Sequence, residues 1–418
     1  IGYSDNCTAT ETITNIGLLN TSNVTSMYRV FYYTGYKSMT KLDLGTNFDT
    51  SNVTNMFDMF WYCGYNSMTE LNLGSKFNTS KVTNMGFMFP HCGEMKLKSL
   101  DLGENFDTSN VTKMNAMFGE VGRQKMTSLK LGSKFDTSKV TTMKWMFAGT
   151  GQYSMTDFSF GDKFDTSNVT DMYGMFTNFA NVLEVIDLGD KFDTSKVTTM
   201  VNMFADAGKT STKTLKLGDK FNTNNVTDMY CMFMNFGNTN VTTIDLGPAF
   251  VNIPTGSRNP ITTEGSNVPK HEATEKMFSN TGKSGSLVIQ APEAIFKDTT
   301  HFRANTNSTT TIELTTGTIN PKYRTEWTKE NVEVNTTEKT MKITLRGTTN
   351  PEVLAKEYTS DVTTSLEKNN VKVLIDGENA TNNISIDVGT ATQGTNTTTG
   401  AKDVIQTITL SNLEQAGF

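Results

Sequence analysis

The sequence predicts a right-handed solenoid of the α/β class, in which each turn contributes one parallel strand and one short helical segment, followed by a β-sandwich. Two observations predict the solenoid. A 29-residue unit recurs along the first part of the chain, and every copy carries a short strand pattern that ends in glycine. A period of about 20 to 50 residues is typical of a solenoid, because each unit can bury its apolar face only against its neighbours. The sandwich is predicted because the period is lost after about residue 320, where alternating strand patterns follow. A stack of this kind offers a long surface rather than an enclosed pocket.

The repeat is anchored by the pattern F-D-T-S-N-V-T-x-M-x-x-M-F. Its first apolar residue recurs every 29 residues, except for one interval of 28, and a broken ninth copy opens at Phe250. The spacing of Val53, Met56 and Met59 favours a short helical segment with one buried side, capped by the preceding Asp-Thr-Ser. A strand followed by a turn stays open as an alternative, because Val-Thr also favours strand. The eight anchor positions are Leu19, Phe48, Phe77, Phe106, Phe135, Phe164, Phe192 and Phe221.

A second pattern, apolar-x-x-apolar-x-apolar-Gly, precedes each anchor. In one copy it reads Leu42-Asp-Leu44-Gly45. The period-two pair of leucines predicts a short strand with alternate faces buried, and the glycine predicts a sharp turn at its end. Stacked turns should align these strands into a parallel sheet along one side of the coil.

Breaks in the repeat set the expected domain boundaries. We expect an N-terminal cap over residues 1–18, a solenoid over 19–300, a cap or linker over 301–320 and a β-sandwich over 321–418. An insertion near 251–273 contains Pro254, Pro260 and Pro269 and is expected to be a projecting loop. Alternating segments such as Met341-Lys-Ile343-Thr-Leu345 predict the sandwich, whose last strand we expect to be missing.

Composition excludes several classes of protein. The chain has 418 residues and a formal net charge of −6, with no basic stripe, so no nucleic-acid partner is expected. No apolar run approaches the roughly 18 residues that a membrane span needs, so no membrane insertion is expected. Four cysteines are too few for a scaffold built on disulfides. No signal peptide opens the chain and no anchoring signal ends it. We interpret it as a fragment of a larger exported protein.

Catalysis finds no support in the sequence. The three histidines, His91, His271 and His301, stand in no nucleophile or metal motif. We therefore predict that the protein is not an enzyme and has no cofactor and no metal site. The recurring aspartates suggest calcium as an alternative, but each lacks a second carboxylate at ligand spacing within its own unit. An ice-binding face built from the threonine columns stays open as a remote alternative.

Two groups of residues are candidate binding sites. The first is a set of aromatic residues that occupy the same offsets in the first two units, extended by a histidine in the third; the alternative is that they only cover the end of the stack. The second is a polar group on the predicted sheet face. The first group is Tyr32, Tyr33, Tyr36, Trp61, Tyr62, Tyr65 and His91, and the second is Asp101, Lys130 and Asp157.

Cys63 and Cys92 occupy the same offset in consecutive units. Their Cα atoms should therefore lie about 5 Å apart, within the range of a disulfide. We predict a disulfide between them in an oxidised preparation, with two stacked free thiols as the alternative. Cys7 and Cys231 have no such registration and are expected to be unpaired.

The anchor pattern followed by Leu-x-Leu-Gly resembles the BspA-like leucine-rich-repeat surface proteins of bacteria, over residues 19 to about 250. The solenoid would then be leucine-rich-repeat-like: Asn47 and Asn105 stand at the consensus asparagine position, although lysine replaces it in five other copies. Residues 321–418 resemble the Ig-like stalk modules of bacterial surface proteins. The resemblance implies an extracellular, cell-wall-displayed adhesin that binds a host or extracellular-matrix protein or glycan. The alternative is a structural spacer, or a self-associating component of a surface layer or biofilm.

Overall fold

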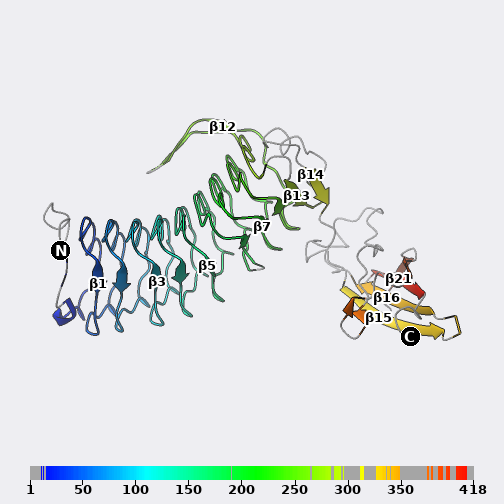
Figure 1. Ribbon diagram of the computed structural model, residues 1–418, viewed down its shortest axis with the longest axis horizontal. Helices are drawn as coiled ribbons and strands as arrows, with labels where there is room; N and C mark the ends of the chain where they lie inside the picture. Colours follow the sequence, from blue (N-terminus) through cyan, green and yellow to red (C-terminus); the bar gives the residue numbers. More distant parts are fainter. Residues whose placement is uncertain are drawn as a thin grey trace. The chain divides into compact units, whose positions relative to one another are not determined.

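A computed structural model shows a parallel-strand solenoid followed by a second unit (Figure 1). The chain divides into two compact units, residues 1–315 and 316–418, which are described separately. In the first unit the structure describes residues 11, 13, 16–189, 191–263, 266–283, 287–292, 295 and 311–314. In the second it describes residues 326–335, 337–338, 340–348, 374–375, 378–379, 385–388, 392–395 and 402–411.

Short parallel strands line one side of the solenoid, one in each turn (Figure 1). Their register is one repeat, so that Leu42 lies beside Leu71, and Leu100 beside Leu129. They form three successive sheets: β1-β2, β3-β4-β5 and β6-β7-β8-β13-β14. The predicted parallel-strand solenoid is confirmed. The strands are β1 (Lys41–Asp43), β2 (Glu70–Asn72), β3 (Ser99–Asp101), β4 (Ser128–Lys130), β5 (Asp157–Phe158), β6 (Val185–Asp187), β7 (Thr214–Lys216), β8 (Thr243–Asp245), β13 (Val288–Ala291) and β14 (Thr311–Leu314).

The helical segment predicted for each turn is wrong. In the segment after each Val-Thr, alternate N–H groups donate to the next turn: Met27 to Asn55 O, Arg29 to Phe57 O and Phe31 to Met59 O. Between them, the N–H of Val30 donates to Met27 O, three residues back. Arg29 has a φ of 56°, in the left-handed region. A backbone that alternates in this way cannot make the i→i−4 bonds of an α-helix. Val53, Met56, Met59 and Phe60, the apolar residues at these spacings in the second copy, are nevertheless all fully buried.

The threonine of the anchor pattern is a buried structural residue. Thr50 and Thr108 are fully buried. The hydroxyl of Thr50 donates to the carbonyl of Asn78 in the next turn at 2.7 Å and accepts from the N–H of Asn78 at 2.8 Å. The preceding acid makes a local turn instead of capping a helix, because the carboxylate of Asp49 accepts from the N–H of Ser51 at 2.8 Å. The threonine hydroxyl therefore joins one turn to the next, whereas the acid stabilises the turn within its own copy.

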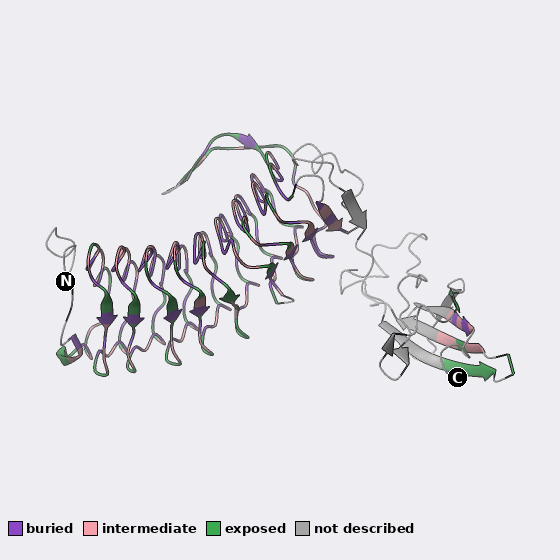
Figure 2. Ribbon diagram, in the orientation of Figure 1, coloured by how far each residue is buried: buried purple, intermediate pink, exposed green. Residues whose placement is uncertain are grey.

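Columns of phenylalanine and methionine fill the interior of the solenoid. Phe60, Phe89 and Phe118 stack at centroid distances of 5.2 and 5.8 Å, with interplanar angles of 1° and 3°. The neighbouring Met59 and Met88 are fully buried. Figure 2 shows the buried residues along the inner side of every turn. Because every turn buries the same side chains against the next, the core is continuous along the stack.

The insertion near 251–273 contains secondary structure, although it was expected to be a projecting loop. β9 (Ser257–Arg258) pairs with β12 (His271–Glu272), and β10 (Ile261–Thr263) pairs with β11 (Ser266–Val268), both antiparallel. Val268 packs with Tyr173 and Val201 of the solenoid turns. The buried ring of His271 lies 2.9 Å from the carboxylate of Asp228 through Nε2. The insertion is therefore attached to the turns that it follows.

The second unit is an antiparallel sheet in its described residues. The strand order is β15-β16-β21-β19, with β20 also paired to β21, and β17 pairs with β18. A second sheet packed against the first is not shown within the described ranges, so the Ig-like sandwich stays a prediction. The strands are β15 (Glu326–Asn335), β16 (Thr340–Thr348), β17 (Leu374–Ile375), β18 (Glu378–Asn379), β19 (Ser385–Val388), β20 (Thr392–Thr395) and β21 (Lys402–Ser411).

Several predicted segments lie largely outside the described residues. Of the cap over 1–18, the structure describes residues 11 and 13 and the 3-10 helix η1 (Ile16–Leu18). Of the linker over 301–320, it describes β14 alone. Among the described residues there is no apolar helix long enough to cross a membrane.

Candidate binding site on the turns

The segment that precedes each strand carries two columns of side chains, with one member of each column in every turn. The first column holds Tyr33, Tyr62, His91 and Glu120, one per turn, all with φ between 54° and 57°. The second column holds the residues three positions later, Tyr36, Tyr65, Glu94 and Arg123. Each left-handed residue is fixed by a hydrogen bond from its own N–H to the next turn, such as His91 to Gly119 O at 2.8 Å. The fold therefore sets the spacing and direction of these side chains.

The aromatic candidates form one continuous group, which we call the aromatic platform: Tyr32, Tyr33, Tyr36, Trp61, Tyr62, Tyr65 and His91. Within the first column, the ring of Tyr33 lies 4.6 Å from that of Tyr62 at an interplanar angle of 38°, and Tyr62 stacks on His91 at 4.2 Å with parallel rings. Within the second column, Tyr36 stacks on Tyr65 at 4.7 Å with an interplanar angle of 3°. All seven side chains are partly exposed. The structure thus brings together every residue of the first predicted group.

The aromatic platform also has a structural role. Trp61 stacks on Phe87 at 5.2 Å and meets Tyr32 edge to face at 5.8 Å. Burial, with a smaller contribution from Tyr33 and nearby carboxylates, raises the pKa of Tyr62 to about 12. Its hydroxyl therefore keeps its proton at neutral pH and can donate a hydrogen bond. The two alternatives that the sequence predicts, a binding surface and a cover over the end of the stack, are both compatible with these contacts.

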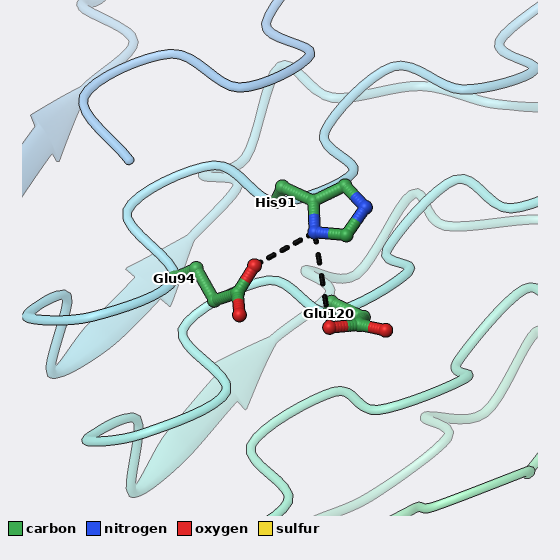
Figure 3. A group of neighbouring side chains, drawn as sticks. All are labelled: His91, Glu94 and Glu120. Atoms are coloured by element: carbon green, nitrogen blue, oxygen red, sulfur yellow. Dashed lines mark hydrogen bonds and ion pairs between the residues drawn. The ribbon is translucent and has the colours of Figure 1, made fainter. Parts of the chain in front are cut away.

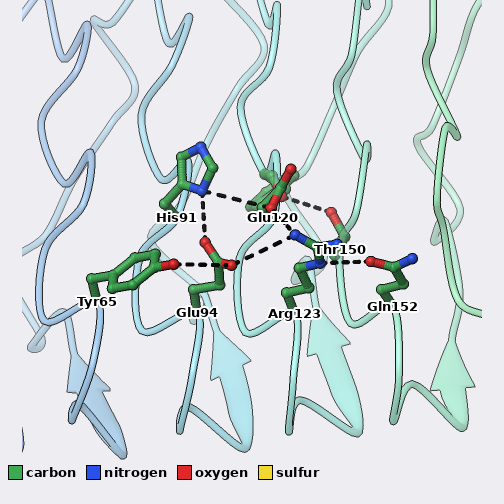
Figure 4. A network of polar contacts seen from close by, with 8 residues as sticks. Tyr65, His91, Glu94, Glu120, Arg123, Thr150 and Gln152 are labelled. Carbon is green, nitrogen blue, oxygen red and sulfur yellow. Dashed lines mark hydrogen bonds and ion pairs between the residues drawn. The ribbon is translucent and has the colours of Figure 1, made fainter.

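A charged cluster continues the same two columns beyond the aromatic platform (Figure 4). We define it as His91, Glu94, Glu120 and Arg123. Nδ1 of His91 lies 2.7 Å from Oε2 of Glu94 and 3.8 Å from Oε2 of Glu120. Nη1 of Arg123 lies 2.8 Å from Oε2 of Glu120 and 3.8 Å from Oε1 of Glu94. The side chain of Glu94 is only 5% exposed, so one of the two carboxylates is held away from solvent.

Neighbouring polar groups hold the charged cluster in place. The hydroxyl of Tyr65 donates to Oε1 of Glu94 at 3.5 Å, and Nε of Arg123 donates to Oε1 of Gln152 at 2.6 Å. The pKa of Arg123 is raised: burial opposes its charge, but Glu120 and other neighbours outweigh that effect. Sequence reasoning found His91 and missed the other three residues. Aligning the repeats by column would have shown that they replace the tyrosines of the earlier turns.

The sheet-face candidates form a separate group on the strands. Asp101 of β3 and Lys130 of β4 are register partners, and Asp157 of β5 lies beside Ser128. All three candidates are exposed. The structure therefore places them on the sheet, away from the two columns of the turns.

An open cavity lies where β5 and β6 do not pair. It has a volume of about 480 Å³ and is lined mainly by apolar residues, among them Phe158, Phe160, Leu183 and Val185. Phe158 and Phe160 replace the Leu-x-Leu of other copies, and the 28-residue interval follows them. These changes in the repeat coincide with the interruption of the sheet between β5 and β6.

Cys63 and Cys92 are fully buried free thiols in adjacent turns. Burial, together with a hydrogen bond to Cys63, raises the pKa of Cys92 well above its usual value. A disulfide is not formed in this structure, and the bridge stays a prediction for an oxidised preparation. Cys231 is also a buried thiol, and Cys7 lies outside the described residues.

Comparison with known proteins gives one family. The family described as "Mycoplasma protein of unknown function, DUF285" matches residues 4–130, 65–160, 96–177 and 154–246. No curated protein and no solved structure matches the chain. The four matches overlap and are staggered along the solenoid, as a repeat would produce, and together they run from residue 4 to residue 246 of 418. Because they cover more than half of the chain, the protein belongs to the DUF285 family.

Proposed function

We propose that this protein is a non-enzymatic adhesin of the bacterial cell surface, which binds a host or extracellular-matrix protein or glycan through the aromatic platform. The observation that carries the proposal is the contiguous set of seven partly exposed rings on neighbouring turns. Aromatic side chains stack on sugar faces and anchor protein interfaces, and contiguous exposed rings are typical of binding surfaces. The resemblance to BspA-like leucine-rich-repeat proteins supports an extracellular location.

The arrangement of the rings favours binding for an energetic reason. The left-handed backbone and ring-to-ring stacking already restrict Tyr33, Tyr62 and His91 in the unbound protein. Side chains that are restricted before binding lose little further conformational entropy on contact with a ligand. The hydroxyl groups of Tyr62 and Tyr65 add hydrogen-bonding capacity at the edges of the rings. A flat ligand face with polar edges, such as a sugar ring, matches this combination.

The test begins with an array of purified glycans and extracellular-matrix proteins, which supplies the ligand. Replacing Tyr33, Trp61 and Tyr62 together by alanine should then weaken binding about tenfold or more, since each such residue at a hot spot contributes about 1 to 2 kcal/mol. Because Trp61 stacks on Phe87, the variant should also melt somewhat earlier. A second variant with phenylalanine at the three positions keeps an aromatic ring at each and removes the hydroxyl groups and the indole.

The results for these two variants distinguish a ligand-binding role of the aromatic platform from a purely structural one. Weakened binding by the alanine variant, with the phenylalanine variant between it and the unmodified protein, supports the proposal. An alanine variant that binds normally but melts much earlier would show that the aromatic platform only covers the end of the stack. The candidate site would then move to Asp101, Lys130 and Asp157 on the sheet face.

A second candidate is a structural spacer or a self-associating surface component. The continuous repetitive stack supports it, because it extends a chain without requiring any ligand. Sedimentation velocity over a range of protein concentrations tests self-association. A monomer at all concentrations, together with a ligand found on the array, favours the adhesin.

A further inference from the structure

We propose that His91, Glu94 and Glu120 bind a divalent transition-metal cation of the Zn²⁺ type (Figure 3). The three side chains come from two adjacent turns: His91 and Glu94 are three residues apart in one turn, and Glu120 stands one repeat after His91. The site shares His91 with the aromatic platform, but its test uses the metal alone and so does not depend on the adhesin proposal. Sequence reasoning predicted no metal because it examined carboxylates within single units, whereas these ligands meet across a turn boundary.

The spacing of the donor atoms suits a single ion. One nitrogen of His91 and one oxygen from each glutamate lie within 4.8 Å of one another. Zinc binds histidine nitrogen and carboxylate oxygen at about 2.0 to 2.2 Å, so two ligand atoms of one ion lie about 3 to 4.4 Å apart. The Nδ1 of His91 is 3.8 Å from Glu120 and 2.7 Å from Glu94. Only small side-chain adjustments are needed to admit a cation between them.

The chemistry of the donors selects the class of metal. One imidazole nitrogen with two carboxylates is a borderline donor set, which favours Zn²⁺ and related transition metals over Ca²⁺ and Mg²⁺, whose ligands are oxygen atoms. Nδ1 of His91 lies at hydrogen-bond distance, 2.7 Å, from Oε2 of Glu94, so this nitrogen is the one placed to bind a cation. On metal binding, the neutral ring carries its hydrogen on Nε2 and offers the lone pair of Nδ1. Three protein ligands leave a position for water or for a ligand group.

The surroundings orient two of the ligands before a cation arrives. The ring of His91 lies parallel to that of Tyr62, 4.2 Å away. The hydroxyl of Tyr65 donates to Oε1 of Glu94, so that Oε2 is the oxygen that faces His91. Outer contacts of this kind fix ligand orientation and commonly change metal affinity 10- to 100-fold.

Arg123 is the group that a cation must displace. Its Nη1 lies 2.8 Å from Oε2 of Glu120, the same oxygen that faces His91. When Glu120 turns to the metal, Arg123 keeps its hydrogen bond to Gln152 at 2.6 Å and its position over the ring of Tyr153 at 5.7 Å. The cluster holds two carboxyl groups and one guanidinium, so its acidic side chains outnumber Arg123. The cluster is therefore electrostatically suited to a dication, with Arg123 as a competitor that limits the affinity.

The test uses the tag-free full chain, titrated with Zn²⁺ by calorimetry and with Co²⁺ as an absorbing probe. The expected result is saturable binding of one ion and a rise in melting temperature with Zn²⁺. His91→Asn and Glu120→Gln should each weaken binding about tenfold or more. Arg123→Met should instead tighten it, because the competing cation is removed. That opposite change is the sharpest signature of the site, since general damage to the fold cannot produce it.

A matched control is available in a later turn. Asp206 occupies the first column three turns after Glu120 and pairs with Lys209 at 2.5 Å. Asp206→Asn removes a carboxylate from an equivalent position and should leave Zn²⁺ binding unchanged.

The proposal is overturned if the unmodified chain shows no saturable binding up to about 1 mM Zn²⁺. It is equally overturned if folded His91→Asn and Glu120→Gln bind as the unmodified chain does, or if Arg123→Met binds no more tightly. A melting curve for each variant establishes that it is folded.

Discussion

At the scale of single residues, the Asp or Asn that follows each anchor residue makes the same local contact in successive turns. Its side-chain oxygen accepts the N–H of the residue two positions later, at 2.8 Å for Asp49 with Ser51 and 2.9 Å for Asp107 with Ser109. Asparagine makes the same contact at Asn78 with Ser80, also at 2.9 Å. The turn therefore needs the acceptor oxygen and not the charge. The charge has a separate consequence for stability.

The pH dependence of stability follows from these carboxylates. Hydrogen bonds from Ser51 lower the pKa of Asp49 below its ordinary value of 3.8. For Asp107 burial acts in the opposite direction and is the largest single influence, but hydrogen bonds from Ser109 and nearby lysines outweigh it, so its pKa is also lowered. A lowered folded-state pKa contributes stability that is present above the unfolded value and lost as the pH falls through the folded value. The protein should therefore lose stability below about pH 4.

The double variant Asp49→Asn with Asp107→Asn tests this. Because Asn78 shows that asparagine fits the turn, the variant should fold normally and lose less stability than the unmodified chain between pH 5 and pH 3. Urea unfolding at the two pH values measures the difference. Identical losses in the two proteins would contradict a role for these carboxylates.

At the scale of elements, the glycines that follow the strands differ in how much space a side chain would have at each of them. Gly74 and Gly103 both have a positive φ, 78° and 75°. A Cβ at Gly74 would lie 1.9 Å from the carbonyl oxygen of Gly45, whereas a Cβ at Gly103 meets nothing within 4 Å. Gly103 follows β3, which begins a new sheet, and this explains the extra space.

The two glycines form a matched pair for mutation. Gly103→Ala should cost about 1 to 2 kcal/mol, the strain of a left-handed alanine. Gly74→Ala carries the same strain and must also move the backbone of the neighbouring turn, so it should cost clearly more. Urea unfolding of both variants gives the comparison. Equal costs would show that the close approach at Gly45 relaxes easily.

The sequence predicts the strands better than the segments between them. Leu42-Asp-Leu44-Gly45 has one interpretation, because alternation and a terminal glycine both indicate a strand. The spacing of Met56 and Met59 fits a helix and also fits a chain that turns at left-handed residues such as Asp58 and Tyr62. Left-handed backbone at residues other than glycine leaves little trace in a sequence. The helix was predicted for that reason.

The candidate site was likewise predictable from the sequence only in part. The aromatic platform was predictable because equal offsets in consecutive copies place side chains next to one another. The sequence did not single out Glu94, Glu120 and Arg123, because charged residues are common on the solvent-exposed turns of proteins. Their significance depends on distances between turns, which the repeat alone does not give.

At the scale of the whole molecule, the two compact units should fold independently. The solenoid buries its side chains within its own turns, and the continuous core extends from Ile16 to Ile295. A fragment of residues 1–315 should therefore melt at the same temperature as the corresponding transition of the full chain. Circular dichroism melting of both proteins measures this. A fragment that melts much earlier would show that residues 316–418 stabilise the solenoid.

The inter-turn hydrogen bonds have one further consequence, which concerns how such genes change. Each turn presents the same donors and acceptors to its neighbours, such as Thr50 to Asn78 and Thr108 to Asp136. Unequal recombination between two copies of the repeat would remove or add 29 residues and leave the threonine contacts between the remaining turns of the same type. A duplication inserted between the second and third copies would separate the rings of Tyr62 and His91 by one added turn and preserve the fold. Variation in copy number can therefore alter the display of side chains in a single genetic event, without passing through an unstable protein.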